Sequence, residues 1–438
     1  MEVNVPSDML NIAEPESVDE SIEYEFREYK PQNPAAINSG QAIQIDIHNQ
    51  DIYVQPSRSY LQIEGQVTPA AGGAYATTAA ISFINNAIPF FFSQIRYWLN
   101  GSEIENVMNP GQVTTMKGML TYGDDFSKAE GLNQCWQKDT TAAAALANTG
   151  WVARRQMIIV KPNPVGTFSF CVPLKYLFGF CDDYTKVIYG VKHSLLLSGK
   201  QDNEVIFRDG GVPAGGLTAA AAGVITLTKL AWLMPHVMPS IYYRNILDTQ
   251  KENKIKVPVA FRALQGDQLA VQISTTFSWP LAIKTGTEKP RWLLIAFQTG
   301  RSGSQTVNPA VFDHLQVRNI YALLNSDRYP LIDMSLNFTQ MKTSRAYKAL
   351  RDFKEEYYGI EGRESSNQVT PIDFVNFFPI FVLDVRRQSE RLKTSVHNIQ
   401  IRAEFNANPP ANTIAYATLI SDRMLTLDSD GNKFNVVF

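Results

Sequence analysis

Three short segments of this 438-residue chain come closest to known chemical motifs, and each lacks an essential part. Gly300-Arg-Ser-Gly-Ser304 resembles a phosphate-binding loop, but it has no lysine and no helical pattern follows it. Gly123-Asp-Asp125 resembles the paired aspartates of polymerases, yet no second acidic cluster accompanies it. Asp428-Ser-Asp430-Gly431 begins like a calcium loop, but the bidentate Glu at loop position twelve is missing. We therefore expect solvated turns and no catalytic residues.

The residues that most often bind metals are also dispersed. The five histidines share no ligand spacing, and a structural role is the expectation for most of them: His48, His193, His236, His314 and His397. Cys135, Cys171 and Cys181 form no C-x-x-C pair and no even-numbered disulfide framework. We predict free thiols, buried or half-buried, in a protein made in a reducing compartment. No metal, no cofactor and no enzymatic activity is predicted.

Charge limits the partners further. The chain has 40 Lys and Arg against 42 Asp and Glu, a net charge of −2, which excludes a strongly basic nucleic-acid wrapper. The densest basic segment, Arg386-Arg387 with Glu390-Arg391-Leu-Lys393, lacks the interleaved aromatics of a single-strand binder. We expect it to be a subunit-facing polar loop with Arg–carboxylate pairs. Residues 1–30 hold nine acidic and two basic residues, and they predict a flexible acidic arm.

The elements that would position any site follow the period of two that is typical of strands. Alternating segments are Ile43–Ile47, Leu61–Val67, Val257–Ala263, Leu269–Ile273, Phe277–Ile283 and Ile399–Phe405, while Trp292–Phe297 is apolar on both faces, as in a covered central strand. Gly, Pro and Asn separate these strands, so the pattern favours antiparallel sandwiches over βαβ units. No apolar run is long enough to span a membrane, and no signal peptide is recognisable.

Helical patterns are few. Ser344–Tyr358 places Ala346, Leu350, Phe353 and Tyr357 on one stripe, with Ser344 as the expected N-cap and Gly359 as the stop. A shorter helix is predicted over Val113–Leu120. Three segments rich in Ala, Gly and Thr predict long loops: Ala70–Ala80, Thr140–Gly150 and Gly210–Gly223.

The two halves of the chain repeat the same order of features. Residues 93–101 (SQIRYWLNG) and 315–326 (LQVRNIYALLNS) share a pattern, and a helix candidate near an Asp-Phe pair follows each, Asp125-Phe126 or Asp352-Phe353. Phe168–Leu174 and Phe377–Leu383 are a later matching pair. Duplication of a β-sandwich of roughly 200 residues explains this order. We place the join near residues 245–253, which divides the chain into an arm (1–30) and two sandwiches (31–248 and 249–438).

Several motifs resemble the major capsid proteins of the Polinton-like and adintovirus group. In the first half these are residues 48–65 (HNQDIYVQPSRSYLQIEG), 110–118 (PGQVTTMKG) and 131–140 (GLNQCWQKDT). In the second half they are 288–292 (EKPRW), 325–330 (NSDRYP), 387–393 (RQSERLK), 410–416 (PANTIAY) and 421–425 (SDRML). The similarity covers about residues 22 to 437.

This resemblance implies a mainly β protein with two tandem antiparallel jelly rolls, a double jelly roll, and a few short helices between strands. It further implies a structural protein of the virion: a homotrimer of pseudo-hexameric outline that tiles an icosahedral shell, with a penton and minor capsid proteins as partners. Specific nucleic-acid binding is not implied.

Two alternatives remain open at this point. A jelly-roll carbohydrate-binding or attachment protein would need a surface cluster of Trp or Tyr, whereas the tryptophans are scattered: Trp98, Trp136, Trp151, Trp232, Trp279 and Trp292. A β-sandwich glycosidase would need two carboxylates flanking a cleft, and no such pair stands out.

Overall fold

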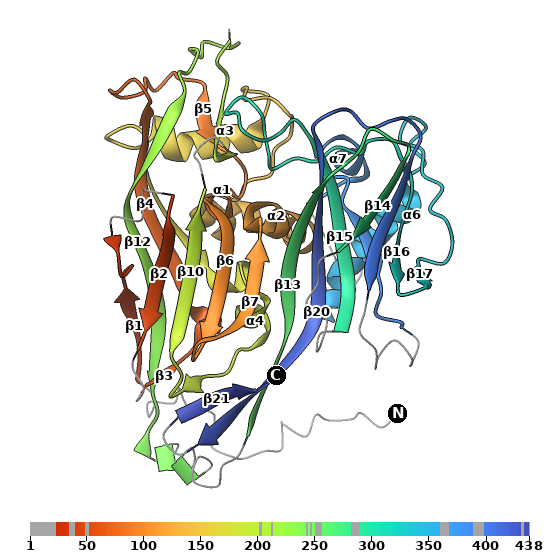
Figure 1. Cartoon of the computed structure of the whole chain (residues 1–438). Helices are drawn as coiled ribbons and strands as arrows, with labels where there is room; N and C mark the ends of the chain where they lie inside the picture. The colour runs from red at the N-terminus through yellow and green to blue at the C-terminus, as the bar shows by residue number, and fades with distance from the viewer. Residues whose placement is uncertain are drawn as a thin grey trace, which may run out of the picture.

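Antiparallel strands, many with alternating burial, form the sheets of both halves of the molecule (Figure 1). The computed structural model describes residues 23–34, 40–48, 52–200, 204–211, 213–241, 244–245, 248–249, 256–281, 289–359, 368–388, 398–430 and 433–437. Residues 23–238 are called the first half below and residues 257–437 the second half. They hold separate sets of sheets, which lie next to each other in the figure.

The first half contains two large sheets. One has the order β8 (Thr167–Pro173), β4 (Tyr60–Pro69), β12 (Gly223–Met238), β3 (Tyr53–Val54) and β9 (Ile188–Tyr189), with β1 (Glu23–Tyr29) also pairing with β12. The other has the order β2 (Ala42–Ile47), β10 (His193–Gly199), β6 (Phe92–Leu99) and β7 (Ser102–Met108). A small ladder joins β11 (Ile206–Arg208) and β5 (Ile81–Phe83).

The second half again contains two large sheets. One has the order β13 (Val257–Ala270), β20 (Thr413–Asp430), β15 (Lys289–Thr299) and β18 (Phe381–Asp384), with β21 (Lys433–Val437) pairing with β20. The other has the order β14 (Thr276–Pro280), β19 (Ile399–Phe405), β16 (Val317–Leu324) and β17 (Asp327–Tyr329).

Both halves have one topology. The sheet β1-β12-β4-β8 corresponds strand for strand to β13-β20-β15-β18, and β2-β10-β6-β7 corresponds to β14-β19-β16-β17. Two facing four-stranded antiparallel sheets in this order form a jelly roll, so the predicted fold class is confirmed. The predicted repeat matches as well: its two motifs contain most of β6 and all of β16, each with the turn that leads to the next strand of a hairpin. Asn100 and Asn325 take positive φ at the two turns, 45° and 55°.

The core of each half lies between its two sheets. In the second half, the Phe297 ring of β15 packs against Phe381 of its own sheet at 6.2 Å. It also packs against Phe277 and Phe405 of the facing sheet, at 6.4 and 5.8 Å. Tyr97 has a similar central place in the first half. The predicted central strand Trp292–Phe297 is confirmed, because all its residues are buried and β15 lies between β20 and β18.

Two predicted helices are present, as α2 (Pro110–Thr121) and α6 (Ser344–Tyr358). The α6 stripe of Ala346, Leu350, Phe353 and Tyr357 is buried, and Gly359 ends the helix at φ 64°. The N-cap prediction was one residue off: Thr343 is the N-cap and Ser344 is the first helical residue. Asp352-Phe353 lies inside α6, whereas Asp125-Phe126 follows α2.

The remaining helices are short and lie between strands. They are α1 (Ala87–Phe90), α3 (Thr149–Arg155), α4 (Gly179–Asp183) and α7 (Pro371–Asn376), with single turns η3 (Pro56–Arg58), η4 (Phe126–Lys128), η5 (Glu130–Gln134), η6 (Gln156–Val160) and η7 (Leu174–Tyr176). The described parts of the three small-residue segments are turns and irregular loops, as predicted, until α3 begins at Thr149 and β12 at Gly223. Among the described residues, no helix is long and apolar enough to cross a membrane.

Two predictions about strands were wrong. We expected residues 23–29 to be part of a flexible arm, yet they form strand β1. This strand pairs with β12 from Glu23↔Met238 to Tyr29↔Trp232. The high acidic count obscured the alternation of Tyr24 and Phe26. Leu269–Ile273 is not a separate strand, because β13 keeps its register with β20 as far as Ala270 and the chain then bends. The rest of the arm and most of the predicted join lie outside the described residues.

Replacing Phe297 by Ala removes the ring that joins the two sheets of the second half. We expect the free energy of unfolding to fall by roughly 3–5 kcal/mol, the usual cost of emptying a buried Phe site. Denaturant unfolding followed by tryptophan fluorescence measures the change. Met424→Ala on β20, a side chain that is 64% exposed, is the control; equal losses in the two variants would contradict this account of the core.

Candidate functional site: the junction between the two halves

The three segments that resemble chemical motifs form a loop, an exposed turn and part of a strand. The loop that begins at Gly300 turns without forming a helix, and Arg301 forms a bidentate pair with Asp313, at 3.1 and 2.6 Å. Asp124 and Asp125 are exposed at the turn after α2, as expected. Asp428–Asp430 are not a turn, because they continue β20 and pair with β21; Gly431 lies outside the described residues.

The four described histidines each have contacts of their own. The Nδ1 of His193 and the Nε2 of His236 are each 2.8 Å from a tyrosine hydroxyl, Tyr97 or Tyr29. Burial lowers the pKa of His193 to about 3, so it is neutral. The His314 ring stacks on Phe338 at 4.5 Å, and the exposed His48 lies near Asp46. His397 is outside the described part of the chain.

The thiols and indoles belong mostly to the interior. Cys135 and Cys181 are buried, Cys171 is half-buried, and all three are free, as predicted. Five of the six tryptophans are buried, namely Trp136, Trp151, Trp232, Trp279 and Trp292, and Trp98 is half-buried. In the described residues no group of three His, Cys, Asp or Glu is placed to hold a metal ion.

Arg386 forms Arg–carboxylate pairs, as we predicted for the basic segment. It contacts Asp384 at 2.9 Å and also Glu356, and its guanidinium lies 4.7 Å from the centre of the Trp292 ring. Both carboxylates belong to this chain. Residues 389–397 lie outside the described residues.

The largest concentration of buried charge lies where the two halves meet. The edge strand β7 of the first half runs beside β13, the edge strand of the second (Figure 1). The backbones approach so closely that a Cβ on Gly266 would lie 2.1 Å from the Met108 carbonyl oxygen. A Cβ on Gly179 of α4 would lie 1.7 Å from that of Arg262. Glycine is therefore required at both places.

Glu105 of β7 connects the two edges. Its Oε1 accepts the backbone N–H of Gly179 at 2.9 Å and that of Leu264 at 2.8 Å, and its Oε2 accepts the N–H of Phe180 at 2.9 Å. Leu264 belongs to the second half, so a side chain of the first half satisfies an edge-strand donor of the second. Arg423 of β20 donates in the opposite direction, to the Ile104 carbonyl.

Burial raises the pKa of Glu105 to about 7, and the three N–H donors and the nearby Lys117 oppose that rise. The side chain is fully buried, so water cannot replace these donors. Protonation of Glu105 therefore takes place near neutral pH, at the centre of the junction.

Ion pairs flank Glu105. Lys117 of α2 contacts Asp182 at 2.8 Å and lies 5.2 Å from the centre of the Tyr357 ring of the second half. Arg262 of β13 donates to Asp183 through Nε at 2.9 Å, and its guanidinium stacks 3.6 Å from the centre of the same tyrosine ring. Carboxylates of the first half therefore pair with cations of both halves at this junction.

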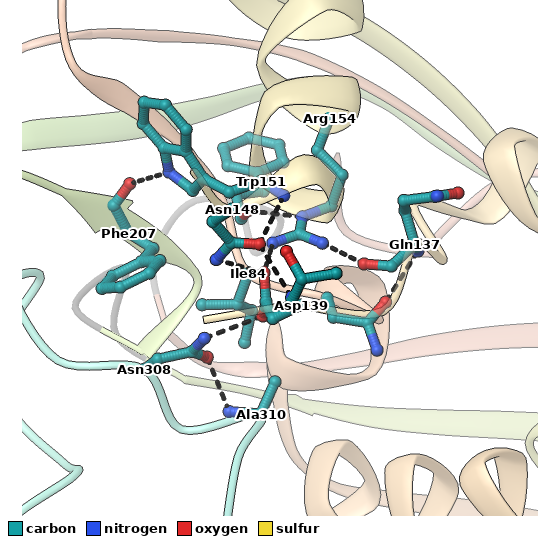
Figure 2. A network of polar contacts seen from close by, with 12 residues as sticks. Ile84, Gln137, Asp139, Asn148, Trp151, Arg154, Phe207, Asn308 and Ala310 are labelled. Atoms are coloured by element: carbon teal, nitrogen blue, oxygen red, sulfur yellow. Dashed lines mark hydrogen bonds and ion pairs between the residues drawn. The ribbon is translucent and has the colours of Figure 1, made fainter. Parts of the chain in front are cut away.

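A second network lies near α3 (Figure 2). Asp139 is fully buried and accepts Arg154 Nη2 at 2.5 Å and Asn148 Nδ2 at 2.9 Å on the same oxygen. Its other oxygen accepts Asn308 Nδ2 from the second half at 2.8 Å. Arg154 also donates to the carbonyls of Phe83 and Gln137. One buried carboxylate thus connects two loops of the first half to the loop after β15.

Two glutamines complete the contacts between the halves. Gln305 pairs with the backbone of Gly223 in both directions, at 2.8 and 2.7 Å. Gln368 accepts the indole N–H of Trp136 at 3.0 Å and donates to the Gly123 carbonyl at 2.7 Å. Beside it, Lys138 contacts Asp373 at 2.6 Å. These contacts fix one half against the other.

Sequence reasoning missed Glu105, Asp139, Arg154 and Asn308. The closest signal was the Gly300 loop, five residues before Gln305, which was compared with phosphate loops instead. Asp139 and Asn308 are 169 positions apart, and Glu105 and Leu264 are 159 apart. Only the fold brings them together, so no local spacing reveals the pairs.

A protein-family model described as a double jelly roll-like domain matches residues 81–425. Among solved structures, the Sputnik virophage matches with a TM-score of 0.56 at 10% identity, over 100% of this chain and 93% of the other. The mavirus major capsid protein matches with a TM-score of 0.52 at 13% identity, over 99% and 93%. The Faustovirus major capsid protein gives 0.52 at 9%, over 93% and 91%. At such low identities, these structural matches show a common fold and no more. No curated protein sequence matches the chain significantly.

Asp139→Asn tests the second network. The amide keeps the shape but offers one acceptor oxygen, so an N–H₂ group must face a donor and the buried Arg154 loses its counter-charge. We expect a loss of roughly 3–5 kcal/mol in the free energy of unfolding. Asp125→Asn, at an exposed carboxylate, should change it by less than about 0.5 kcal/mol. Equal stability of the two variants in urea titrations would refute the role of Asp139.

The raised pKa of Glu105 makes the free energy of unfolding depend on pH. Its folded pKa of about 7 is above the unfolded value, so the native state holds the proton longer and stability falls as the pH rises from about 5 to 8. Relative to Glu105→Gln, which cannot titrate, the wild type should lose roughly 3 kcal/mol over this range. Denaturant unfolding of both proteins at several pH values measures the difference, and parallel curves would contradict the assignment.

Proposed function

The chain belongs to the double jelly roll-like family, and from this membership we propose that it is a viral major capsid protein. The observation that carries the proposal is the extent of the similarity. Two sandwiches of one topology, fixed together by buried charge, align over nearly the full length of the mavirus and Faustovirus major capsid proteins. A fold shared over both halves supports a tile made of the whole chain rather than a module grafted onto another protein.

The sequence motifs support a proposal for the viral group to which the chain belongs. Motifs such as residues 48–65 and 421–425 resemble the Polinton-like and adintovirus group, and we propose that the chain belongs there. Its location would then be the virion capsid, and its role structural rather than enzymatic. We propose domains close to 31–248 and 249–438, with β1 (Glu23–Tyr29) added to the first jelly roll.

We further propose that three chains form a capsomer of pseudo-hexameric outline, and that capsomers tile an icosahedral shell together with a penton and minor capsid proteins. One chain supplies two similar sandwiches side by side, so three chains supply six. The net charge of −2 offers the genome no strongly basic surface, which agrees with a shell that does not bind specific nucleic-acid sequences. The burial of most tryptophans does not favour the carbohydrate-binding alternative.

Purified full-length protein should have the mass of three chains by light scattering and should show six-lobed particles by electron microscopy. The interfaces are expected to persist from low to physiological salt, because large obligate contacts rest mainly on apolar area. A stable monomer at all salt concentrations and pH values would contradict the proposal. Glycan-array binding by such a monomer would favour the attachment protein instead.

A further inference from the structure

The outer face of the sheet β2-β10-β6-β7 carries one large aromatic residue that the core does not use. Along β6 the side chains of Tyr97 and Leu99 are buried in the core, whereas Trp98 alternates to the outer face and is half-buried. The other five tryptophans of the chain are all buried. Counted from the hairpin turn, the corresponding residue of the second half is Leu323. An indole at this position is therefore required neither by the core nor by the repeat.

Trp98 lines a cavity of about 250 Å³ on this outer face, which we call the Trp98 cavity. The strands that form it face the viewer in Figure 1. Ser194 of β10 is paired with Trp98 of β6, and Leu196 of β10 is paired with Gln44 of β2. The lining is completed by Lys192, just before β10, and by Gly101 in the turn after β6. Apolar surface from Trp98 and Leu196 thus lies next to several polar groups, the usual composition of a ligand site.

The buried carboxylate of Asp46 holds the polar groups of the cavity in place. Its side chain is 3% exposed, and its Oδ2 lies 3.2 Å from the Nζ of Lys192. The same oxygen accepts the Nε2 of Gln44 at 3.0 Å and that of Gln32 at 2.6 Å. The backbone of Lys192 is fixed as well: its N–H donates to the Oδ1 of Asn100 at 2.7 Å, and its carbonyl accepts the Asn100 N–H at 2.9 Å. A site whose polar groups are already ordered costs less entropy to fill.

We propose that the Trp98 cavity binds one pyranose ring of a neutral glycan. The apolar C–H face of a sugar ring packs on the indole of Trp98, and its hydroxyl groups reach the hydrogen-bonding groups of Gln44, Lys192 and Ser194. Because the charge of Lys192 is paired with that of Asp46, the cavity has no net charge, and this favours a neutral sugar over an acidic one. Such a site adds a contact with a glycosylated surface to the proposed capsid role and does not replace that role.

The size of the cavity agrees with a single ring. Its volume of about 250 Å³ is just below the roughly 300–1,000 Å³ that is typical of sites for drug-sized ligands. One side of the cavity is open at Gly101, which has a φ of 81° and where an added Cβ would meet no atom within 4 Å. A longer oligosaccharide can therefore leave the cavity past this turn.

Saturation-transfer NMR on the full-length wild-type protein tests the site. The probes are neutral oligosaccharides that end in glucose, galactose, mannose or N-acetylglucosamine, with sialyllactose as the acidic comparison. We expect at least one neutral probe to bind with a dissociation constant on the order of 1 mM, as befits one small ring. Trp98→Ala should weaken this binding by roughly tenfold or more, because it removes the central aromatic contact, and Trp98→Phe should retain part of it.

Leu323→Ala is the matched control, since it truncates the outward residue at the corresponding position of the second half and should leave binding unchanged. Thermal unfolding checks that the variants are folded. Failure of every neutral probe to bind the wild type would overturn the proposal, and equal binding by the wild type and Trp98→Ala would do the same. Tighter binding of sialyllactose than of any neutral probe would overturn the neutral class. The mass of the oligomer is measured separately, so each of these results leaves the capsid proposal standing.

Discussion

Every open β-sheet ends in edge strands whose N–H and C=O groups need partners, and the meeting of β7 with β13 is how this chain covers two of them. The strands lie edge to edge without a continuous hydrogen-bonded ladder. Glu105 instead brings a carboxylate to the Leu264 N–H, and Arg423 brings a guanidinium to the Ile104 carbonyl. Side chains thus supply hydrogen bonds that a ladder would otherwise supply. The two sandwiches remain separate sheets, but their relative position is fixed.

This arrangement explains why several buried charged residues gather at the junction. The jelly-roll cores are apolar, and rings such as Phe297 join their sheets. At the junction, by contrast, Glu105 accepts backbone N–H groups of both halves, and the fully buried Asp139 pairs with Arg154 of the first half and Asn308 of the second. Breaking one buried pair leaves its partner uncompensated, so the network strongly penalises any other placement of the two halves.

The sequence predicts many of the strands and helices within each sandwich, but it does not predict the contacts between the two sandwiches. Alternation predicted β2, β4 and β19, a continuous apolar run predicted β15, and helical spacing predicted the buried stripe of α6. Each of these signals lies within a few neighbouring residues. It failed at β1, where acidic residues conceal the pattern, and beyond Leu269, where the pairing of β13 with β20 overrides local alternation. The site depends on pairs such as Asp139 with Asn308, which only the fold brings together.

The two halves share a topology but differ in how fully they are covered, and that difference bears on function. Strand β15 is buried on both faces, where rings of α6 pack on Trp292 and α2 approaches from the first half, while β4 alternates between buried and half-exposed residues. A protein evolved to stand alone would gain little from keeping the aromatic edge at Phe26 and the apolar pair at Leu331 exposed. This asymmetry agrees with the proposed shell, in which neighbouring copies would cover apolar surface that stays exposed on one chain.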